Sequence, residues 1–391
     1  MLDPKGYFLY DALRSFMQNR KPVIALLAPF PLWLVDGAYR QAGWHSATWL
    51  VALREMLEDA DAYEIHWITF WKQTLRRRVF RYGNQTFHVL PAYSLTYAQK
   101  TGYLHARMQV KRELARIQPD IVHAWGTENR FAVSGADFKG KKILSMQGIL
   151  TACAQRAPMA EFMLRQSRHE AEWISSYDVV TSESEWGLER VRELAPSVRS
   201  YRWEYAVRTP FFHAPRQLSE TPVCLFGGSD VPLKDLDTAI SAFSAPTLSH
   251  VRLLLAGPSA EQRPHLPPNI QALGGVGQEK LTELLGGCWC LIHPSMADSC
   301  PNIVKEARVM GVPAIVTTEC GGKQYVENGL SGFVIKPRDV AGLIQAVKTV
   351  CSDRDTAERM GRHGQASCRE ALSRETMMKE LCRLYDNLLK V

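Results

Sequence analysis

Long apolar runs are absent from this chain. The longest, Val23–Val35, is interrupted by Pro29 and Pro31 and is shorter than the roughly 20 residues needed to cross a bilayer. The start of the sequence mixes acidic and basic residues and has no basic-then-apolar secretion signal. We therefore expect a cytoplasmic protein, and peripheral contact with the inner face of a membrane remains open.

Disulfide and metal-ligand spacings are also missing. The chain has 9 cysteines, an odd number that leaves at least one thiol unpaired in any scheme. Cys288, Cys290 and His293 lie in a Cys-Trp-Cys-Leu-Ile-His run that alternates like a buried strand, and no second ligand pair follows at zinc spacing. None of the three Asp-x-Asp triplets follows an apolar strand, where such a triplet holds a metal ion on a diphosphate: residues 59–61, 235–237 and 353–355. We expect no resident metal.

Acidic residues are absent between Glu64 and Glu113, although nine basic residues fall in that window. Residues 1–207 hold 27 Lys/Arg and 21 Asp/Glu, so +6 of the net charge of +7 lies there. Aromatic residues are interleaved with the central arginines Arg76, Arg77, Arg78 and Arg81. This pattern favours an anionic membrane surface or a charged acceptor, and a solvated surface helix and loop is the alternative. No nucleic-acid-binding motif is present, so nucleic acid is not an expected partner.

Short apolar runs alternate with helical patterns along the chain, as in parallel sheets covered by helices. The expected strands are Val23–Ala28, Tyr63–Phe70, Ile121–Trp125, Lys142–Met146, Val179–Thr181, Val223–Phe226, Val251–Ala256, Cys290–His293 and Ala314–Thr317. Helices are expected over about His45–Leu57 and from near Lys234, Glu279, Pro301 and Val340.

The length fits two domains of roughly 100–200 residues each. Three prolines in Thr209–Pro222 interrupt any regular element and mark the join. We therefore predict an α/β fold of two doubly wound, Rossmann-like domains that face each other across a cleft. The expected units are residues 1–208, residues 209–370 and a C-terminal helix over 371–391 that packs back toward the first domain.

The glycine fingerprint of dinucleotide-binding proteins is missing. A nicotinamide oxidoreductase needs G-x-G-x-x-G directly after its first strand. Here the first expected strand runs into Ala28-Pro29-Phe30-Pro31. The missing fingerprint argues against a nicotinamide oxidoreductase, which is the alternative interpretation of a doubly wound fold.

The most informative stretch runs from His293 to Asp339. A strand ends at His293, a loop then presents Asp298 and Ser299, and Pro301 opens a helix. Free amides and the dipole at such a helix start favour a bound diphosphate. Glu306 follows five residues into the helix, where a carboxylate suits two adjacent ribose hydroxyls.

These features resemble the large family-four retaining glycosyltransferases, which have the GT-B fold. The resemblance rests on Asp298-x7-Glu306 with Pro301-Asn302 between them, then Gly311-Val312-Pro313 and Gly321-Gly322, and it is closest over residues 221–340. It implies that Asp298 contacts donor-sugar hydroxyls and that Glu306 binds the ribose. Asp298 stands where the family usually has glutamate, so its carboxylate is one methylene shorter.

The same resemblance extends upstream. Lys234 matches the lysine that neutralises the departing diphosphate, but Ser229 stands where an arginine is expected. Over residues 20–207 the match is looser, and Gln147 replaces a histidine that touches the sugar. The donor-binding set that the resemblance implies is Gly43, Gly228, Ser229, Gly257, Val276, Ser299, Cys300, Pro301, Asn302 and Ile303.

By this resemblance the chain is expected to transfer a sugar, from a UDP-sugar in the first instance, with retention and without a metal ion. The expected acceptor is a hydroxyl of a glycan, a lipid-linked sugar or a small molecule, as in polysaccharide biosynthesis. Two alternatives stay open: a nucleotide-sugar epimerase of the same fold, and a non-catalytic nucleotide-sugar-binding protein, which the missing arginine at Ser229 would suit.

Overall fold

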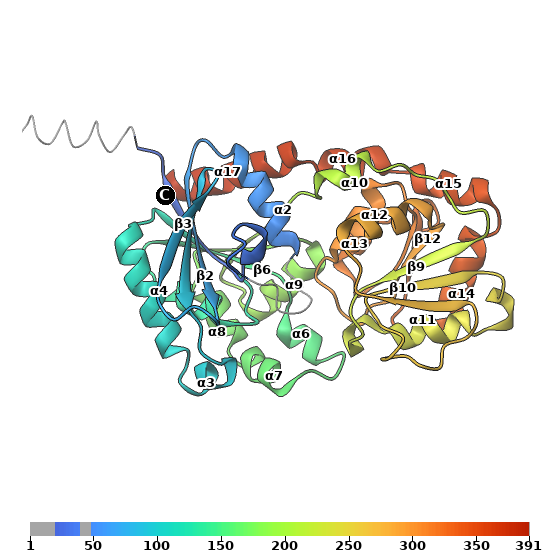
Figure 1. Ribbon diagram of the computed structural model, residues 1–391, viewed down its shortest axis with the longest axis horizontal. Coiled ribbons are helices and arrows are strands. Elements are labelled where there is room, and N and C mark those ends of the chain that lie inside the picture. Colours follow the sequence, from blue (N-terminus) through green and yellow to red (C-terminus); the bar gives the residue numbers. More distant parts are fainter. Residues whose placement is uncertain (1–19, 40–47, 391) are drawn as a thin grey trace, which may run out of the picture.

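The structure is a computed structural model of the 391-residue chain, and it describes residues 20–39 and 48–390. Its N-terminal domain is built on a sheet with the strand order β3-β4-β2-β1-β5-β6-β7-β8 (Figure 1). The strands are β1 (Val23–Leu27), β2 (Glu64–Trp71), β3 (Arg78–Tyr82), β4 (Gln85–Pro91), β5 (Ile121–Trp125), β6 (Lys141–Met146), β7 (Val179–Ser182) and β8 (Arg199–Arg202). All neighbours pair in parallel except β3 and β4, which are antiparallel.

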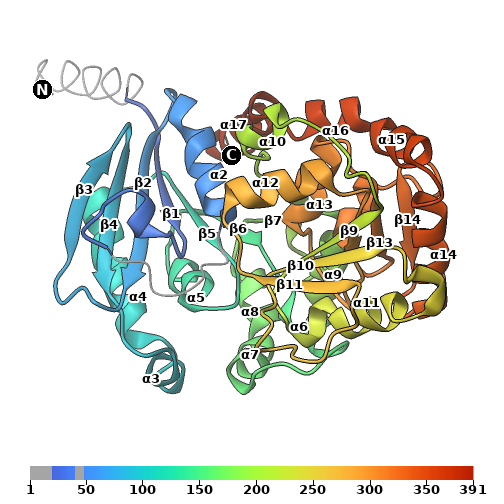
Figure 2. The ribbon, with the colours of Figure 1, turned by 45° about the vertical axis from the view of Figure 1, so that its right-hand side comes forward.

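Helices connect these strands and cover both faces of the sheet (Figure 2). They are α2 (Thr48–Met56), α3 (Leu95–Lys100), α4 (Leu104–Ile117), α5 (Arg130–Ala136), α6 (Leu150–Ala154), α7 (Glu161–Ser167), α8 (Glu170–Ser175) and α9 (Glu185–Leu194). The helix expected over His45–Leu57 is α2, and the first residues of that prediction lie outside the described residues.

The C-terminal domain has a six-stranded parallel sheet in the order β11-β10-β9-β12-β13-β14. Its strands are β9 (Val223–Gly227), β10 (Arg252–Ala256), β11 (Ile270–Gly274), β12 (Cys290–His293), β13 (Ala314–Thr317) and β14 (Gly332–Ile335). Its helices are α11 (Leu236–Phe243), α12 (Gln278–Gly287), α13 (Asn302–Val309), α14 (Val340–Val350), α15 (Arg354–Arg362) and α16 (Gln365–Ala371), with short 3₁₀ turns η3 (Pro232–Lys234) and η5 (Gly321–Tyr325).

Two segments join the domains. The linker is less irregular than its prolines suggest, because Thr209–His213 forms the short helix α10 with proline in its first turn. At the other end α17 (Arg374–Lys390) returns to the N-terminal domain (Figure 1). There Tyr385 donates or accepts a hydrogen bond with the His123 ring at 2.9 Å, and Tyr63 donates to Asp386 at 2.8 Å.

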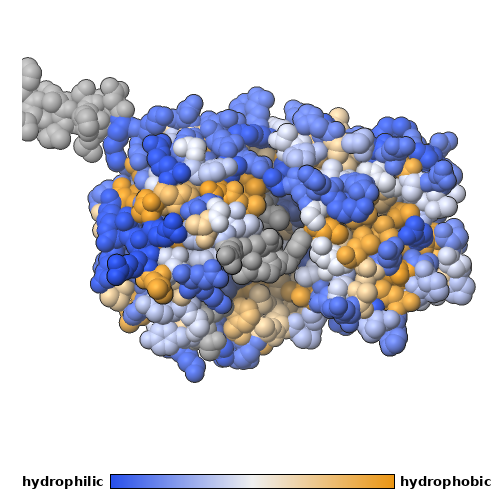
Figure 3. Space-filling view, viewed as in Figure 1, coloured by the Kyte–Doolittle hydropathy of each residue, from blue (hydrophilic) through white to orange (hydrophobic). Residues whose placement is uncertain are grey.

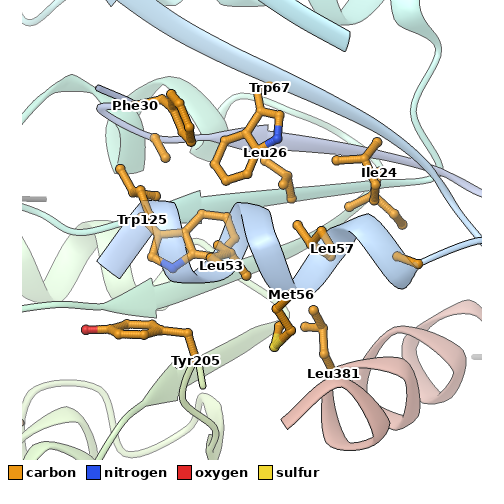
Figure 4. Packing of buried hydrophobic residues seen from close by; sticks show 14 of the residues in the cluster. Ile24, Leu26, Phe30, Leu53, Met56, Leu57, Trp67, Trp125, Tyr205 and Leu381 are labelled. Carbon is orange, nitrogen blue, oxygen red and sulfur yellow. The ribbon is translucent and has the colours of Figure 1, made fainter. Parts of the chain in front are cut away.

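One apolar core combines α2, the N-terminal sheet and α17. Leu53 and Met56 of α2, Trp125 of β5 and Leu381 of α17 are all buried in it (Figure 4). Tyr205, in the segment after β8, lies in the same cluster and its ring stacks on that of Trp49 with centroids 5.4 Å apart. Because one cluster includes chain from both ends, the C-terminal helix is part of the N-terminal core.

The α/β prediction of two doubly wound domains is confirmed, and each expected strand forms within one residue of its expected bounds. Five strands were not expected, namely β3, β4, β8, β11 and β14. The helix expected in the alternative interpretation of the arginine-rich window is wrong, because its arginines precede or lie on β3, which pairs with β4; that the window is solvated surface stays an alternative. Within the described residues no helix is both long and apolar enough to cross a membrane.

Candidate active site

Three loops of the C-terminal domain meet at the carboxyl ends of β9, β10 and β12. Gly257 has a φ of +128°, and a Cβ atom there would lie 2.0 Å from the carbonyl oxygen of Gly228. A side chain at Gly257 would therefore both strain the backbone and push the two loops apart. Ligands of doubly wound sheets bind at this edge, so the two closely packed glycine loops lie where a bound ligand is expected.

A charged cluster lies beside these glycines. Lys234, at the end of η3, donates to the Asp298 carboxylate from the loop after β12. The His293 Nε2 atom lies 3.0 Å from the same carboxylate oxygen. The two loops are also tied by their backbones, because the Met296 amide donates to the Leu233 carbonyl at 2.8 Å. Lys234 therefore forms one compact group with His293 and Asp298, although it precedes Asp298 by 64 positions in the sequence.

The electrostatics of the cluster favour an ionised pair. Burial alone would raise the pKa of Asp298, but Lys234 and His293 outweigh it and hold that pKa well below its usual range. Burial lowers the pKa of His293, so the ring is neutral and its Nε2–H donates to the carboxylate. Asp298 therefore presents an oxygen that can accept hydrogen bonds from sugar hydroxyls.

The first turn of α13 lies close to the N-terminal domain. Pro301 is its N-cap residue, and the Asn302 side-chain oxygen accepts a hydrogen bond from the Tyr205 hydroxyl at 2.9 Å. The Ser184 hydroxyl, just before α9, donates to the Ser299 carbonyl at 2.5 Å. Ser299 and Asn302 thus contact the N-terminal domain as well as bordering the loop that should meet the diphosphate.

The other residues of the donor-binding prediction surround the same loops. Ile303 packs on Gly227, where a Cβ atom would lie 1.8 Å from its Cδ1. Cys300 is buried, Val276 follows β11, and Ser229 is exposed. All nine cysteines of the chain fall in the described part, and each is a free thiol.

Glu306 lies on α13, at the junction of the two domains. Burial raises the pKa of Glu306 to about 7, although Lys305 and Arg208 act against that shift. Beside the carboxyl is a cavity of about 20 Å³ that is also lined by Trp49 and Tyr205. This volume holds little more than a water molecule, so a ribose fits only if the surrounding side chains move.

Known proteins resemble the chain in both sequence and fold. Residues 208–367 match the family described as glycosyl transferases group 1. Residues 208–367 form a group 1 glycosyltransferase domain. A glycogen synthase of Mycobacterium tuberculosis is 26% identical over 299 residues, which cover 68% of this chain and 69% of the relative.

Solved structures extend the likeness to nearly the whole chain. Sucrose-phosphate synthase from Thermosynechococcus elongatus superposes with a TM-score of 0.78 at 17% identity and covers 94% of this chain and 99% of that one. Anabaena HepE, solved with UDP and glucose, gives a TM-score of 0.68 at 14% identity over 94% and 100% of the two chains. At such identities the likeness shows the fold, two Rossmann-like domains in the GT-B arrangement.

Across from the group 1 domain, the N-terminal domain places Gln147 directly after β6. Its side-chain amide is 3.4 Å from a Glu183 oxygen, a long contact that leaves the amide able to turn toward a ligand. Gly43, the other residue predicted there, lies outside the described residues.

The four arginines of the acid-free window precede or lie on the edge strand β3: Arg76, Arg77, Arg78 and Arg81. Arg77 is not free, because its Nε and Nη2 donate to the fully buried Glu113 carboxylate at 2.7 and 2.6 Å. Arg78 lies over the Tyr39 ring and 3.9 Å from Asp36. Arg76 and Arg81 are exposed.

Sequence reasoning missed an ionic network at the domain junction. Lys305 of α13 is buried, and its Nζ lies 2.7 Å from Glu183 after β7 and 3.5 Å from Glu204 after β8. Glu183, Glu204 and Cys300 lie close enough together to hold a metal ion, but the Lys305 ammonium lies among them. The sequence offered no local signal for this network, because Lys305 shares its helix face with Asn302 and Arg308, and Glu183 and Glu204 lie about 100 positions or more before it.

Proposed function

We propose that this chain transfers a sugar from a nucleotide-sugar donor to an acceptor hydroxyl, with retention of the anomeric configuration and without a metal ion. The observation that carries the proposal is the Lys234–Asp298 pair beside the glycine loops of a group 1 domain. The Lys234 ammonium can stabilise the negative charge of the departing diphosphate, and the Asp298 carboxylate beside it can accept hydrogen bonds from the sugar.

In this proposal the loops after β9 and β12 hold the diphosphate, with Lys234 as the cation that replaces a metal. Asp298 accepts hydrogen bonds from sugar hydroxyls, and Glu306 accepts them from the ribose. Gln147 meets the sugar from the opposite domain. Ser229 supplies no positive charge to the diphosphate. The dipole at the start of α13 acts in its place and adds to the attraction of Lys234 for the diphosphate.

The bond changes need no protein nucleophile. The bond from the anomeric carbon to the diphosphate oxygen breaks while the acceptor oxygen bonds to that carbon on the same face. The acceptor's proton passes to the departing diphosphate. The protein supplies position and charge stabilisation, and parting of the domains at the Glu306 cavity admits the donor.

A UDP-sugar is the donor we propose first. Support comes from Anabaena HepE, whose solved structures hold UDP with glucose and UDP-glucose. An E. coli trehalose-6-phosphate protein of the same fold was solved with UDP-2-fluoro glucose. These ligands belong to those proteins, and they make uridine nucleotides the first to test here.

We also propose an anionic or membrane-borne acceptor and peripheral attachment at the cytoplasmic face of a membrane. Around the exposed Arg76 and Arg81, the side chains of Leu75, Val79 and Tyr82 are 91%, 43% and 40% exposed. At the left of Figure 3, the surface of the N-terminal domain shows strongly hydrophilic residues with hydrophobic residues among them. Cations beside exposed apolar groups suit an anionic bilayer surface.

A non-catalytic sugar-nucleotide-binding protein is the second candidate. Two observations favour it: Ser229 in the place of an arginine, and a Lys234 whose charge is already balanced by Asp298. Such a protein would bind a nucleotide sugar without turnover, so the two candidates separate in a product assay.

Thermal shift against a panel of UDP-, GDP- and ADP-sugars, followed by nucleotide release, tests the proposal. We expect a UDP-sugar to raise the melting temperature and to release UDP much faster when an acceptor is added than by hydrolysis alone. Glu306→Ala should weaken UDP binding by about 1.5–3 kcal/mol for each lost bond to the ribose. Glu279→Ala, at an exposed position in the first turn of α12, is the matched control. Unchanged UDP affinity of Glu306→Ala in calorimetry would remove Glu306 from the site.

A further inference from the structure

A second carboxyl group lies at the ligand-binding edge of the N-terminal sheet. Glu128 follows β5, and its side chain folds back between two glycines at adjacent strand ends. A Cβ atom on Gly126, whose φ is +71°, would lie 2.0 Å from Glu128 Oε2, and one on Gly148 would lie 3.0 Å from Oε1. The Gly148 amide also donates to Oε1 at 2.7 Å. The ends of β5 and β6 therefore form a cradle for this carboxylate, and a side chain at Gly126 or Gly148 would collide with it.

The carboxylate of Glu128 is poorly satisfied by the protein. Among residues 20–39 and 48–390 no lysine, arginine or histidine forms an ion pair with it, although a carboxylate can accept about four hydrogen bonds. Burial raises the pKa of Glu128 to about 7, and the nearby Glu170 carboxylate adds to that shift. By contrast, the Glu170 carboxylate accepts three hydrogen bonds, from the Thr127 hydroxyl and from the Leu150 and Thr151 amides.

The edge of the N-terminal sheet that carries Glu128 meets the loop of Asp298, because the Ser184 hydroxyl after β7 donates to the Ser299 carbonyl. Burial raises the pKa of the Cys153 thiol on α6, the Asp298, Glu170 and Glu128 carboxylates add to that shift, and Lys234 acts against it. In addition, Ala297, next to Asp298, is part of the same buried cluster as Cys153. In Figure 1, α6 accordingly lies on the side of the N-terminal domain that faces the C-terminal domain.

We propose that Glu128 binds a hydroxyl group of the acceptor and holds it toward the Lys234–Asp298 pair. This inference rests on the proposed transferase function and adds a residue to its acceptor side. A partly buried, anchored carboxylate that forms no ion pair within the described residues is suited to accept a hydrogen bond from a sugar or polyol hydroxyl. The cradle fixes the carboxylate, so the hydroxyl that it binds takes a defined position.

The test compares Glu128→Gln with the unmodified chain, using UDP-glucose as donor and glucose, glycerol and glucose 6-phosphate as acceptors. Loss of a hydrogen bond to a charged group should lower acceptor kcat/KM by about tenfold or more. UDP affinity in calorimetry and hydrolysis of UDP-glucose without acceptor should stay within about twofold of the unmodified values, since Glu128 does not touch the donor. Glu161→Gln, an exposed carboxyl on α7, is the charge-matched control and should leave all three quantities unchanged.

Unchanged acceptor kcat/KM would overturn the inference, and so would an equal fall in hydrolysis and transfer, which would place Glu128 at the donor or in the fold. If Glu128→Gln melts early, Glu128→Asp keeps the charge and withdraws it by one methylene; acceptor KM should then rise while UDP affinity holds. A rise in donor KM instead would contradict the inference. A chain that neither transfers nor hydrolyses any nucleotide sugar contradicts the proposed function itself, whereas normal transfer by Glu128→Gln contradicts only this inference.

Discussion

At the scale of single residues, the main feature of the candidate site is the contact of Asp298 with Lys234 and His293. Asp298 is one methylene shorter than the glutamate common at its position, and the structure ties it directly to Lys234 and His293. The sequence predicted Lys234 and Asp298 as separate contacts to diphosphate and sugar. Their pairing means that a bound diphosphate must compete with Asp298 for the ammonium, so each charge sets the strength of the other.

Glu306 provides a pH test at the same scale. Its folded pKa is raised from an ordinary value of 4.5 to about 7. The folded chain therefore holds a proton that the unfolded chain has lost, and this contribution to stability disappears as pH rises through about 7. Relative to the unmodified chain, Glu306→Gln should gain melting temperature between about pH 5 and about pH 8.

Ligand-free melting curves of both chains at each pH measure that difference. Taking the difference between two chains cancels the histidines and other carboxyls, which titrate alike in both. A melting difference that stays constant across this pH range would mean that the Glu306 carboxyl is ordinarily solvated.

Among the elements, the fully buried strands could be read from the sequence, whereas the edge strands and the interior strand β4 could not. β1, β5, β9 and β12 are buried along their whole length, so their apolar runs are plain. β3 and β8 are short, mostly exposed and rich in arginine, and their polar pattern does not differ from that of a loop. Glu113, the acid that binds Arg77, stands just past the acid-free window, so the pairing was not visible in the sequence.

The edge strand β3 carries the prediction on membrane contact. Because Arg77 holds Glu113, we expect only Arg76, Arg78 and Arg81 to be available to an anionic surface, at about 1 kcal/mol for each basic residue. Changing these three to Gln should weaken sedimentation with anionic vesicles and leave the fold intact. The control removes three exposed arginines from α15, namely Arg354, Arg359 and Arg362. Equal losses in both variants would indicate a general charge effect, and no loss in either would make β3 ordinary solvated surface.

At the scale of the whole molecule, the features that could not be predicted from the sequence are contacts between the two domains. The residues predicted to meet the donor between Asp298 and Glu306 lie close together in sequence, so their order alone was enough to propose them. Lys305 meets Glu183 across 122 positions, and Arg156 meets Glu319 across 163, at 2.7 and 2.6 Å. No local pattern predicts such pairs, because they exist only once both sheets are folded and placed edge to edge. The same reason hid Glu128, which becomes notable only opposite the group 1 domain.

The most direct test of the central claim is sugar transfer in excess EDTA with the anomeric configuration of the product read by proton NMR. The donor is the α-linked UDP-sugar that stabilises the chain most in the thermal panel. We expect transfer at an undiminished rate and an α-linked product, because Lys234 stands in for a metal ion and no inverting base is needed. A β-linked product, or activity that is lost in EDTA and restored by magnesium or manganese, would contradict a metal-free retaining transferase.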